Sequence, residues 1–184
     1  MTRIVAGRAG GRRLAVPRSG TRPTSHRVRE AVFSALEARL VLDGARVLDL
    51  YAGSGALGLE ALSRGAARVR FVESDRRAVD VLRRNVADLA LPGAQVTAAP
   101  VATVLTGPSD APYDLVLLDP PYALPDGDLA GVLAVLTAGQ WLAPGALIVV
   151  ERSSRGAAPG WPEGVSPLTE RTYGDTRMHY GSAP

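Results

Sequence analysis

Short apolar runs alternate with amphipathic stretches along most of the chain, and this alternation is the first indication of its fold. The clearest apolar runs stand at 47–50, 69–72, 115–118 and 147–150. Such runs are typical of strands that are buried on both faces of a parallel sheet. The intervening segments with helical spacing of apolar residues are roughly 56–64, 76–90 and 128–138. A weaker strand and a helical turn are expected within 95–106. Alternating strands and helices predict an open α/β sheet with helices on both faces.

The two ends of the chain show other patterns. An amphipathic helix is expected over about 26–42, because apolar residues recur there every fourth position: Val28, Val32, Leu36 and Leu40. Ahead of this helix, segments 3–6 and 12–16 flank a glycine-rich turn, which favours a small β-hairpin. A second hairpin is expected over about 167–180, where a Gly–Asp pair separates two short runs.

The charges are distributed unevenly. All 21 cationic residues are arginine, and residues 1–29 hold eight of them with no acid, a charge of +8. Residues 30–184 carry −5, so the net charge of +3 conceals a basic arm on an acidic body. Coding bias explains arginine in place of lysine, but it does not explain the absence of acids from the arm. This asymmetry indicates a polyanionic partner, with nucleic acid ahead of a membrane surface.

The composition excludes several classes of protein. The 184 residues are 46% hydrophobic and 21% charged, which is typical of one globular domain. The absence of cysteine excludes disulfides, cysteine-ligated metals and thiol catalysis. With only two histidines, far apart in sequence, we expect no metal site and no Ser-His-Asp triad. The sequence has neither an apolar run long enough to span a membrane nor the apolar core of a signal peptide, so we expect a cytoplasmic protein.

A glycine-rich loop follows the first run of the sheet region. Gly53, Gly55 and Gly58 satisfy the G-x-G-x-x-G pattern, which lets a ligand approach bare main chain at the start of a helix. Asp49 precedes this loop, where its carboxylate would oppose a pyrophosphate but favour the ammonium and sulfonium groups of S-adenosylmethionine. Glu73, at the end of the second run, can accept hydrogen bonds from the ribose hydroxyls of S-adenosylmethionine or of a dinucleotide. It therefore does not distinguish between these two cofactors.

The second motif is D-P-P-Y at 119–122, directly after a buried run. The two prolines hold Asp119 and Tyr122 stiffly in place. An exocyclic amino group on a planar base is a poor nucleophile, because its lone pair is delocalised into the ring. Hydrogen bonds to the Asp119 carboxylate and the Pro120 carbonyl would direct that lone pair, and Tyr122 would stack on the base. Catalysis would then rest on positioning and electrostatics.

Together these motifs resemble class I S-adenosylmethionine-dependent amino-methyltransferases. Nearly the whole chain is similar to the bacterial guanine-N2 methyltransferases of 16S ribosomal RNA. The similarity includes R-I-V-A-G-x-x-G-G-R-R-L from Arg3, R-P-T-S-H-R-V-R-E from Arg22, the glycine loop and D-P-P-Y. The resemblance implies a Rossmann-like class I methyltransferase fold with a seven-stranded, mostly parallel sheet and a C-terminal antiparallel hairpin. A small basic N-terminal β-hairpin extension would precede it.

The resemblance also implies an activity and a domain organisation. The enzyme would transfer a methyl group from S-adenosylmethionine to N2 of one guanine in 16S ribosomal RNA of the assembling small subunit. Residues 1–23 would form an RNA-binding extension, and residues 24–184 the methyltransferase domain. We expect it to act as a monomer, with the small subunit or its assembly intermediate as partner and with neither a membrane nor a metal.

Site residues are carried over by position. The cofactor pocket would comprise Asp49, Tyr51, Gly53, Gly55, Gly58 and Glu73. Arg22 and Thr24 are expected to approach the methionine carboxylate of the cofactor or the substrate. The amine-binding corner would comprise Asp119, Pro120, Pro121 and Tyr122. The arginines expected to bind RNA phosphates are Arg8, Arg12, Arg13 and Arg18. The chain lacks the Asp that such enzymes often place beside the adenine after the third strand, at 97–101, so backbone groups would recognise adenine.

Three other functions compete with this interpretation. An adenine-N6 or protein-glutamine methyltransferase would keep the cofactor, but such enzymes typically have Asn in place of Asp119 and a separate target-recognition domain. A non-catalytic ribosome assembly factor would hold the cofactor without turnover, which leaves intact Asp119 and Tyr122 without a role. An NAD-dependent oxidoreductase would have no use for Asp49 or for the D-P-P-Y corner.

Overall fold

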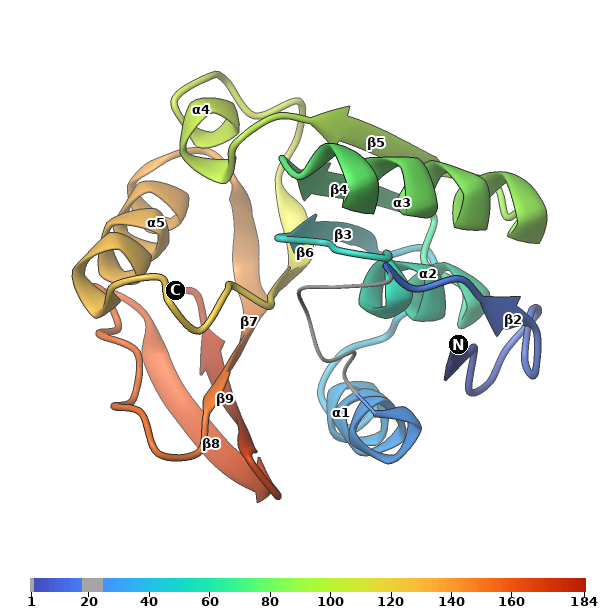
Figure 1. The fold of residues 1–184 in the computed structure, drawn as a ribbon. Coiled ribbons are helices and arrows are strands. Elements are labelled where there is room, and N and C mark those ends of the chain that lie inside the picture. Colours follow the sequence, from blue (N-terminus) through green and yellow to red (C-terminus); the bar gives the residue numbers. More distant parts are fainter. Residues whose placement is uncertain (1, 18–24) are drawn as a thin grey trace.

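The computed structural model describes residues 2–17 and 25–184, and its centre is a seven-stranded sheet in the order β5-β4-β3-β6-β7-β9-β8 (Figure 1). The strands are β3 Arg46–Leu50, β4 Arg68–Glu73, β5 Ala94–Ala98, β6 Tyr113–Leu118, β7 Leu142–Ser153, β8 Ser166–Tyr173 and β9 Thr176–Ser182. Strands β3 to β7 pair in parallel, whereas β9 pairs antiparallel with both β7 and β8. The expected mostly parallel sheet with a C-terminal antiparallel hairpin is confirmed.

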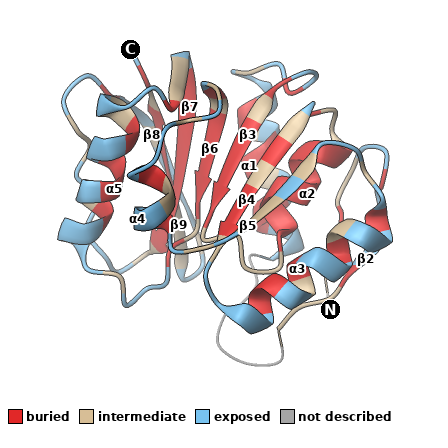
Figure 2. Cartoon of the chain, turned by 90° about the horizontal axis from the view of Figure 1, so that it is seen from above, coloured by how far each residue is buried: buried red, intermediate tan, exposed pale blue. Residues whose placement is uncertain are grey.

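Helices cover both faces of this sheet, as the alternating pattern predicted. They are α1 His26–Glu37, α2 Ala56–Ser63, α3 Arg76–Leu89, α4 Val101–Leu105 and α5 Asp126–Ala138. The first three lie on one face and the last two on the other (Figure 2). Among the described residues, no helix combines the length and the apolar character needed to cross a membrane.

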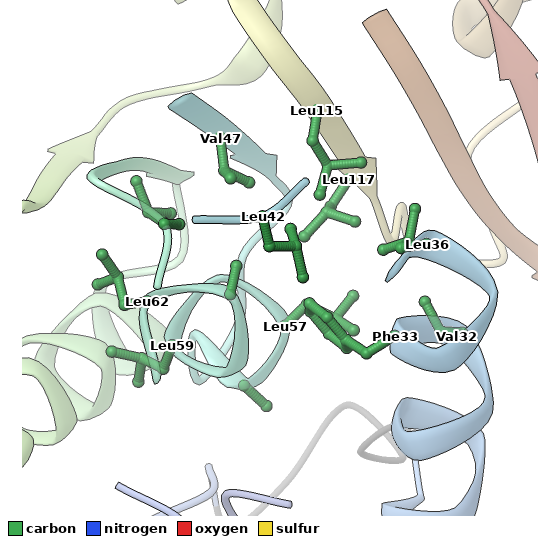
Figure 3. Close-up of a cluster of buried hydrophobic side chains, with 14 of the residues drawn as sticks. Val32, Phe33, Leu36, Leu42, Val47, Leu57, Leu59, Leu62, Leu115 and Leu117 are labelled. Carbon is green, nitrogen blue, oxygen red and sulfur yellow. The ribbon is translucent and has the colours of Figure 1, made fainter. Parts of the chain in front are cut away.

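The central strands are buried on both faces because their side chains alternate between the two helical layers. Val47, Leu115 and Leu117 point to the layer of α1 and α2, where they join a cluster that contains Phe33 and Leu57 (Figure 3). The next residue along each strand points to the layer of α4 and α5 instead. Each such side chain contributes roughly 1.5–3 kcal/mol by burial, so a one-residue slip of register would be costly. The pairing register of these strands is therefore well determined.

The N-terminal residues form the expected hairpin, although its paired strands are very short. Strands β1 Thr2–Arg3 and β2 Arg13–Leu14 make a separate two-stranded sheet that packs beside α2 (Figure 1). The hairpin is not a free arm, because Ile4, Ala9 and Leu14 are buried in the same cluster as α1 and α2. The expected division at residues 23 and 24 lies in the segment outside the described residues.

Element boundaries differ most from the sequence expectation at the end of α1 and at the beginning of β7. The first helix begins at His26, with the Ser25 hydroxyl as its cap, but it ends at Glu37 and not near residue 42. Its apolar period continues to Leu40 and Leu42 because both pack on the core after the chain has left the helix. Strand β7 begins at Leu142, five residues before the apolar run that indicated it. Apolar periodicity thus located these elements but not their ends.

Candidate functional site

Acidic side chains meet where neighbouring parallel strands end. Asp49 lies in β3, Glu73 ends β4 and Asp119 follows β6, and these three strands are adjacent in the sheet. Glu151, near the end of β7, lies one strand further along. Ligands of open α/β sheets bind beyond the carboxyl ends of the strands, so this edge is the expected place for chemistry.

The glycine loop connects β3 to α2 directly above Asp49. Tyr51 has a φ of 59°, an uncommon backbone conformation for a non-glycine residue, and such conformations often occur at functional sites. Gly55 has a φ of 80° and caps α2 without a side-chain hydrogen bond. A Cβ atom on Gly58 would lie 2.3 Å from the Phe71 ring and 2.8 Å from Asp49 Oδ2, so only glycine fits there. The loop therefore brings bare main chain close to a buried carboxyl group.

Asp49 is fully buried beneath this loop. Its Oδ2 accepts a hydrogen bond from the Gly58 amide at 2.9 Å, which fixes the carboxyl group against the first turn of α2. Burial raises the pKa of Asp49 to about 8, partly offset by the Gly58 hydrogen bond and reinforced by the negative charge of Glu73. A cation placed beside Asp49 would stabilise its ionised form and would itself be bound more tightly.

Glu73 fixes the position of the loop relative to β4. Its Oε2 accepts from the Gly53 amide at 2.8 Å, and its Oε1 accepts from the amides of Ser74 and Asp75 at 2.8 and 2.9 Å. A carboxylate has about four acceptor positions, so capacity remains for the hydroxyls of a ribose. After β5, the Ala99 amide donates to the Glu73 carbonyl at 3.0 Å. Residues 97–101 include no acidic side chain, so backbone groups remain the candidates for contact with an adenine ring.

The D-P-P-Y corner continues β6 into the same edge. The Asp119 amide donates to the Leu50 carbonyl at 3.3 Å, and the Leu124 amide closes a turn onto the Pro121 carbonyl at 2.8 Å. Pro120 is buried, whereas the Tyr122 side chain is 55% exposed and its hydroxyl lies 3.4 Å from Thr176 Oγ1. A rigid acid next to an exposed aromatic ring suits a planar base with an amino group.

Burial and neighbouring negative charges together determine the electrostatics of this corner. Burial raises the pKa of Asp119 well above its ordinary range, and the negative charges of Glu151, Asp49 and Glu73 raise it further. Such an environment disfavours a pyrophosphate and favours a cationic cofactor together with a donor-rich amine. Within the described residues, no group of three or more His, Asp or Glu side chains is arranged to hold a metal ion.

Of the arginines expected to bind RNA, the described ones lie on the N-terminal hairpin, near the ends of α2 and α3. Arg8 and Arg13 are exposed on the N-terminal hairpin. Arg12 is also exposed, but its guanidinium donates to the carbonyls of Asp88 and Leu89 at the end of α3, so it has a structural contact as well. The fourth arginine expected to bind RNA, Arg18, lies outside the described residues, as do Arg22 and Thr24, which were expected to approach the methionine carboxylate of the cofactor or the substrate.

Sequence reasoning missed residues that reach the site from distant elements. Glu151 is 3% exposed, and its Oε1 accepts from the Thr176 hydroxyl at 3.3 Å. Asn85 on α3 joins the N-terminal extension to the glycine loop, since its Nδ2 donates to the carbonyls of Ala15 and Ser54, both at 2.9 Å. Glu151 directly follows the apolar run at 147–150, which is the same signal that singled out Asp119.

Comparison with known proteins places this arrangement in a family. The family model described as conserved hypothetical protein 95 matches residues 2–182. The ribosomal RNA small subunit methyltransferase D of Escherichia coli K12 is 40% identical over 94% of this chain and 85% of its own length. The chain belongs to this family. The putative rRNA methyltransferase YlbH of Bacillus subtilis is 34% identical over 95% of both chains.

Solved structures of similar proteins share the fold. A putative methyltransferase from E. coli, yhhF, superimposes with a TM-score of 0.86 at 36% identity, covering 99% of this chain and 97% of its own. A hypothetical protein of Thermus thermophilus gives a TM-score of 0.81 at 35% identity, covering 98% of each chain. A magnesium protoporphyrin IX methyltransferase from Synechocystis, solved with bound S-adenosylmethionine, has the same fold at 16% identity and a TM-score of 0.67. The expected Rossmann-like methyltransferase fold is thereby confirmed.

Proposed function

We propose that this protein transfers the methyl group of S-adenosylmethionine to the exocyclic N2 of one guanine in 16S ribosomal RNA. The observation that carries the proposal is that two carboxyl groups, the buried Asp49 and the half-buried Asp119, meet at the carboxyl ends of the adjacent strands β3 and β6. Asp49 lies beneath the glycine loop, and Asp119 opens the rigid Pro120–Pro121–Tyr122 corner. This substrate class is supported by the relatives of the chain, which include a ribosomal RNA small subunit methyltransferase and a putative rRNA methyltransferase.

The residues at the strand edge fit this cofactor. Asp49 faces its cationic groups, Glu73 accepts from its ribose hydroxyls, and the loop from Tyr51 to Gly58 admits it against main chain. Arg22 and Thr24 are proposed to reach its carboxylate or the substrate. When bound, the cofactor supplies a methyl group on a positively charged sulfur. The buried acids fit that charge, whereas they would repel the pyrophosphate of a dinucleotide.

The chain's own contribution to the reaction is to position and polarise the amine. The Asp119 carboxylate and the Pro120 carbonyl accept hydrogen bonds from the two N–H groups of the guanine amine, which directs its lone pair away from the ring plane. Tyr122 stacks on the base and holds that plane. After methyl transfer the nitrogen carries an extra proton, and Asp119, with its raised pKa, is suited to accept it and pass it to water.

The N-terminal hairpin is proposed to hold the RNA. Arg8, Arg12, Arg13 and Arg18 would contact phosphates, since guanidinium groups bind phosphate bidentately. The small ribosomal subunit or an assembly intermediate would be the substrate particle in the cytoplasm. The protein would act on it as a monomer.

The deciding experiment is methyl transfer to small-subunit particles that lack the modification. Incubation with labelled S-adenosylmethionine, followed by nuclease mapping, is expected to give N2-methylguanine at one nucleotide. Label in adenine or in protein would contradict the proposal, and no transfer would favour an assembly factor.

A variant pair tests the division of roles. Asp119→Ala is expected to lower turnover by at least about 100-fold while the cofactor Kd changes only a few-fold. Asp80→Ala, at an exposed position on α3, is the matched control and should be indistinguishable from the wild type. An equal loss of cofactor affinity in Asp119→Ala would show that Asp119 belongs to the cofactor pocket instead.

A further inference from the structure

Glu151 occupies on β7 the position that Asp119 occupies at the end of β6. The two strands are parallel, and Leu118 pairs with Val150, so Asp119 and Glu151 are the next residues in register. Neighbouring strands lie about 4.8 Å apart, so the two residues are neighbours across the sheet edge, and the negative charge of Glu151 acts on Asp119. The residues two positions earlier, Leu117 and Val149, share the cluster on the α1 and α2 face, and side chains alternate along a strand. Both acids therefore face the same side of the sheet edge.

A chain of hydroxyl groups connects Glu151 to the aromatic ring of the corner. The Thr176 hydroxyl donates to Glu151 Oε1 at 3.3 Å, and Thr176 Oγ1 lies 3.4 Å from the Tyr122 hydroxyl oxygen. Thr176 is the first residue of β9, whose register pairs it with Ser153 of β7. The C-terminal hairpin thus reaches back to the D-P-P-Y corner and orients a buried carboxyl group there.

The chemistry of guanine gives this second carboxyl group a use. On its Watson–Crick edge guanine presents the N1–H donor directly beside the N2 amine, whereas adenine presents a bare N1 lone pair. If Asp119 and the Pro120 carbonyl accept from the amine, the next acceptor along the sheet edge is Glu151. We propose that Glu151 determines base specificity by accepting a hydrogen bond from N1–H of the target guanine, with Thr176 and Tyr122 holding it in place. The inference rests on the proposed function, and it concerns how that site selects its base.

The same contact would reject bases that lack the N1–H donor. A buried carboxylate facing a lone pair would be left unpaired and would repel it, and sites built to pair a substrate N–H reject analogues without one strongly. Glu151 on β7 and Thr176 on β9 would then contribute to the exclusion of adenine, which would not depend on Asp119 alone.

The test compares guanine with 2-aminopurine at the nucleotide that the wild type methylates. Both bases carry a 2-amino group, but N1 of 2-aminopurine is an acceptor. Placed in a ligated ribosomal RNA, 2-aminopurine is expected to lower kcat/KM of the wild type by about 100- to 1,000-fold. A 6-thioguanine substrate keeps N1–H while replacing O6, so it should retain most of the activity and isolate the role of N1–H.

Glu151→Gln tests the residue itself, because its amide can donate to the N1 lone pair of 2-aminopurine. In this variant the ratio of kcat/KM for guanine to kcat/KM for 2-aminopurine is expected to fall at least tenfold. A merely structural role would lower both rates equally and leave the ratio unchanged. Thr176→Val removes the hydroxyl and keeps the shape of the side chain, and it should lower the same kcat/KM ratio by threefold or more. Glu163→Gln makes the same chemical change at an exposed position and should keep the wild-type ratio.

The outcomes separate the two proposals. Wild-type methylation of guanine N2, with an unchanged ratio in both Glu151→Gln and Thr176→Val, overturns the role of Glu151 alone. Absence of N2-methylguanine from the wild-type reaction overturns the proposed function and this inference with it. Cofactor Kd and thermal unfolding of each variant confirm that the ratios are compared between folded proteins.

Discussion

At the scale of single residues, the site depends on carboxyl groups that the fold holds in unfavourable surroundings. Asp49 is buried beneath the glycine loop and held there by the Gly58 amide, while Asp119 lies among three other acids. These carboxyl groups lower the folding stability of the cofactor-free protein, because burial disfavours their ionised forms. A cationic cofactor and a donor-rich amine would relieve that cost on binding. The acids are therefore better explained by ligand binding than by stability.

Asp49→Asn tests this interpretation for the cofactor. The Asn oxygen can still accept from Gly58, but the negative charge is lost. The Kd for S-adenosylmethionine, measured by calorimetry, is expected to rise by about 10- to 100-fold. An unchanged Kd would contradict the role of Asp49 as the partner of the cofactor's charge.

Asp49→Asn is expected to stabilise the cofactor-free protein, although it weakens cofactor binding. The pKa of Asp49 is about 8 in the folded state and ordinary in the unfolded state, so the folded state binds the extra proton between these values. The free energy of unfolding of the wild type should fall as pH rises toward about 8. Asp49→Asn should therefore gain stability relative to the wild type over this range, by about 1–3 kcal/mol at pH 8, and the difference should level off above it. Urea unfolding at several pH values measures it, and a pH-independent difference would contradict the raised pKa.

The sequence revealed those site residues that stand at the end of an apolar run. Asp49, Glu73 and Asp119 could be predicted because a buried strand places the residue at its carboxyl end at a known edge of the sheet. Glu151 satisfies the same rule and could have been found. Thr176 and Asn85 could not, because each is a lone polar residue whose partners are distant in sequence.

At the scale of elements, the N-terminal hairpin is joined to the core by buried polar side chains. Glu60 on α2 accepts from the amides of Val5 and Ala6 at 2.7 and 3.0 Å, and the Ser63 hydroxyl accepts from the Ala9 amide at 2.9 Å. The buried Asn85 completes the attachment at Ala15 and extends it to the glycine loop. The hairpin, which we propose to bind RNA, is thereby held rigidly to the loop that we propose to bind the cofactor.

Asn85→Ala is expected to weaken this attachment. It removes the hydrogen-bond partners of the Ala15 amide and of the carbonyls of Ala15 and Ser54, which should destabilise the protein by about 2–3 kcal/mol. Hydrogen exchange of residues 2–17 should accelerate more than that of the central strands. Arg83→Ala, at an exposed position on the same helix, should change the free energy of unfolding by less than about 0.5 kcal/mol. Uniform acceleration across the chain would indicate that the hairpin is not a separate unit of local opening.

The order and type of the elements could be predicted, whereas several of their ends could not. Apolar runs located the central strands because these are buried on both faces. The end of α1 was misplaced because Leu40 and Leu42 keep facing the core after the helix has ended at Glu37. The beginning of β7 was missed because Leu142 to Gly145 are less buried than the run that follows.

At the scale of the whole molecule, opposite charges are gathered in different places. The first 29 residues carry +8, while acids gather at the carboxyl edge of the sheet. The hairpin that carries the exposed Arg8 and Arg13 lies beside α2 and away from β8, which forms the far side of the sheet (Figure 1). RNA would thus be attracted to one side of the molecule, and the reactive edge would remain available for the cofactor.

Replacing Arg8 and Arg13 by Ala tests this division. If each contacts one phosphate, the slope of log affinity against log salt concentration should become shallower by about 1.5. Arg155 and Arg171, both exposed and distant from the hairpin in the chain, provide a control pair with the same change in net charge. Arg12 is left intact because its contact with α3 would mix stability with binding. Equal slopes for both pairs would show that net charge, and not the hairpin, governs RNA affinity.

The place of β9 in the sheet has a consequence for synthesis on the ribosome. This strand comes last in the chain among those described, yet it lies inside the sheet between β7 and β8. It also places the Thr176 hydroxyl beside the Tyr122 hydroxyl. A nascent chain can form β3, β4 and the glycine loop before β9 has left the exit tunnel. The half of the protein that is proposed to hold the methyl donor is therefore made first, and the proposed acceptor corner is completed only when β9 inserts. Newly made protein should pass through a stage that binds the donor before it can select a base.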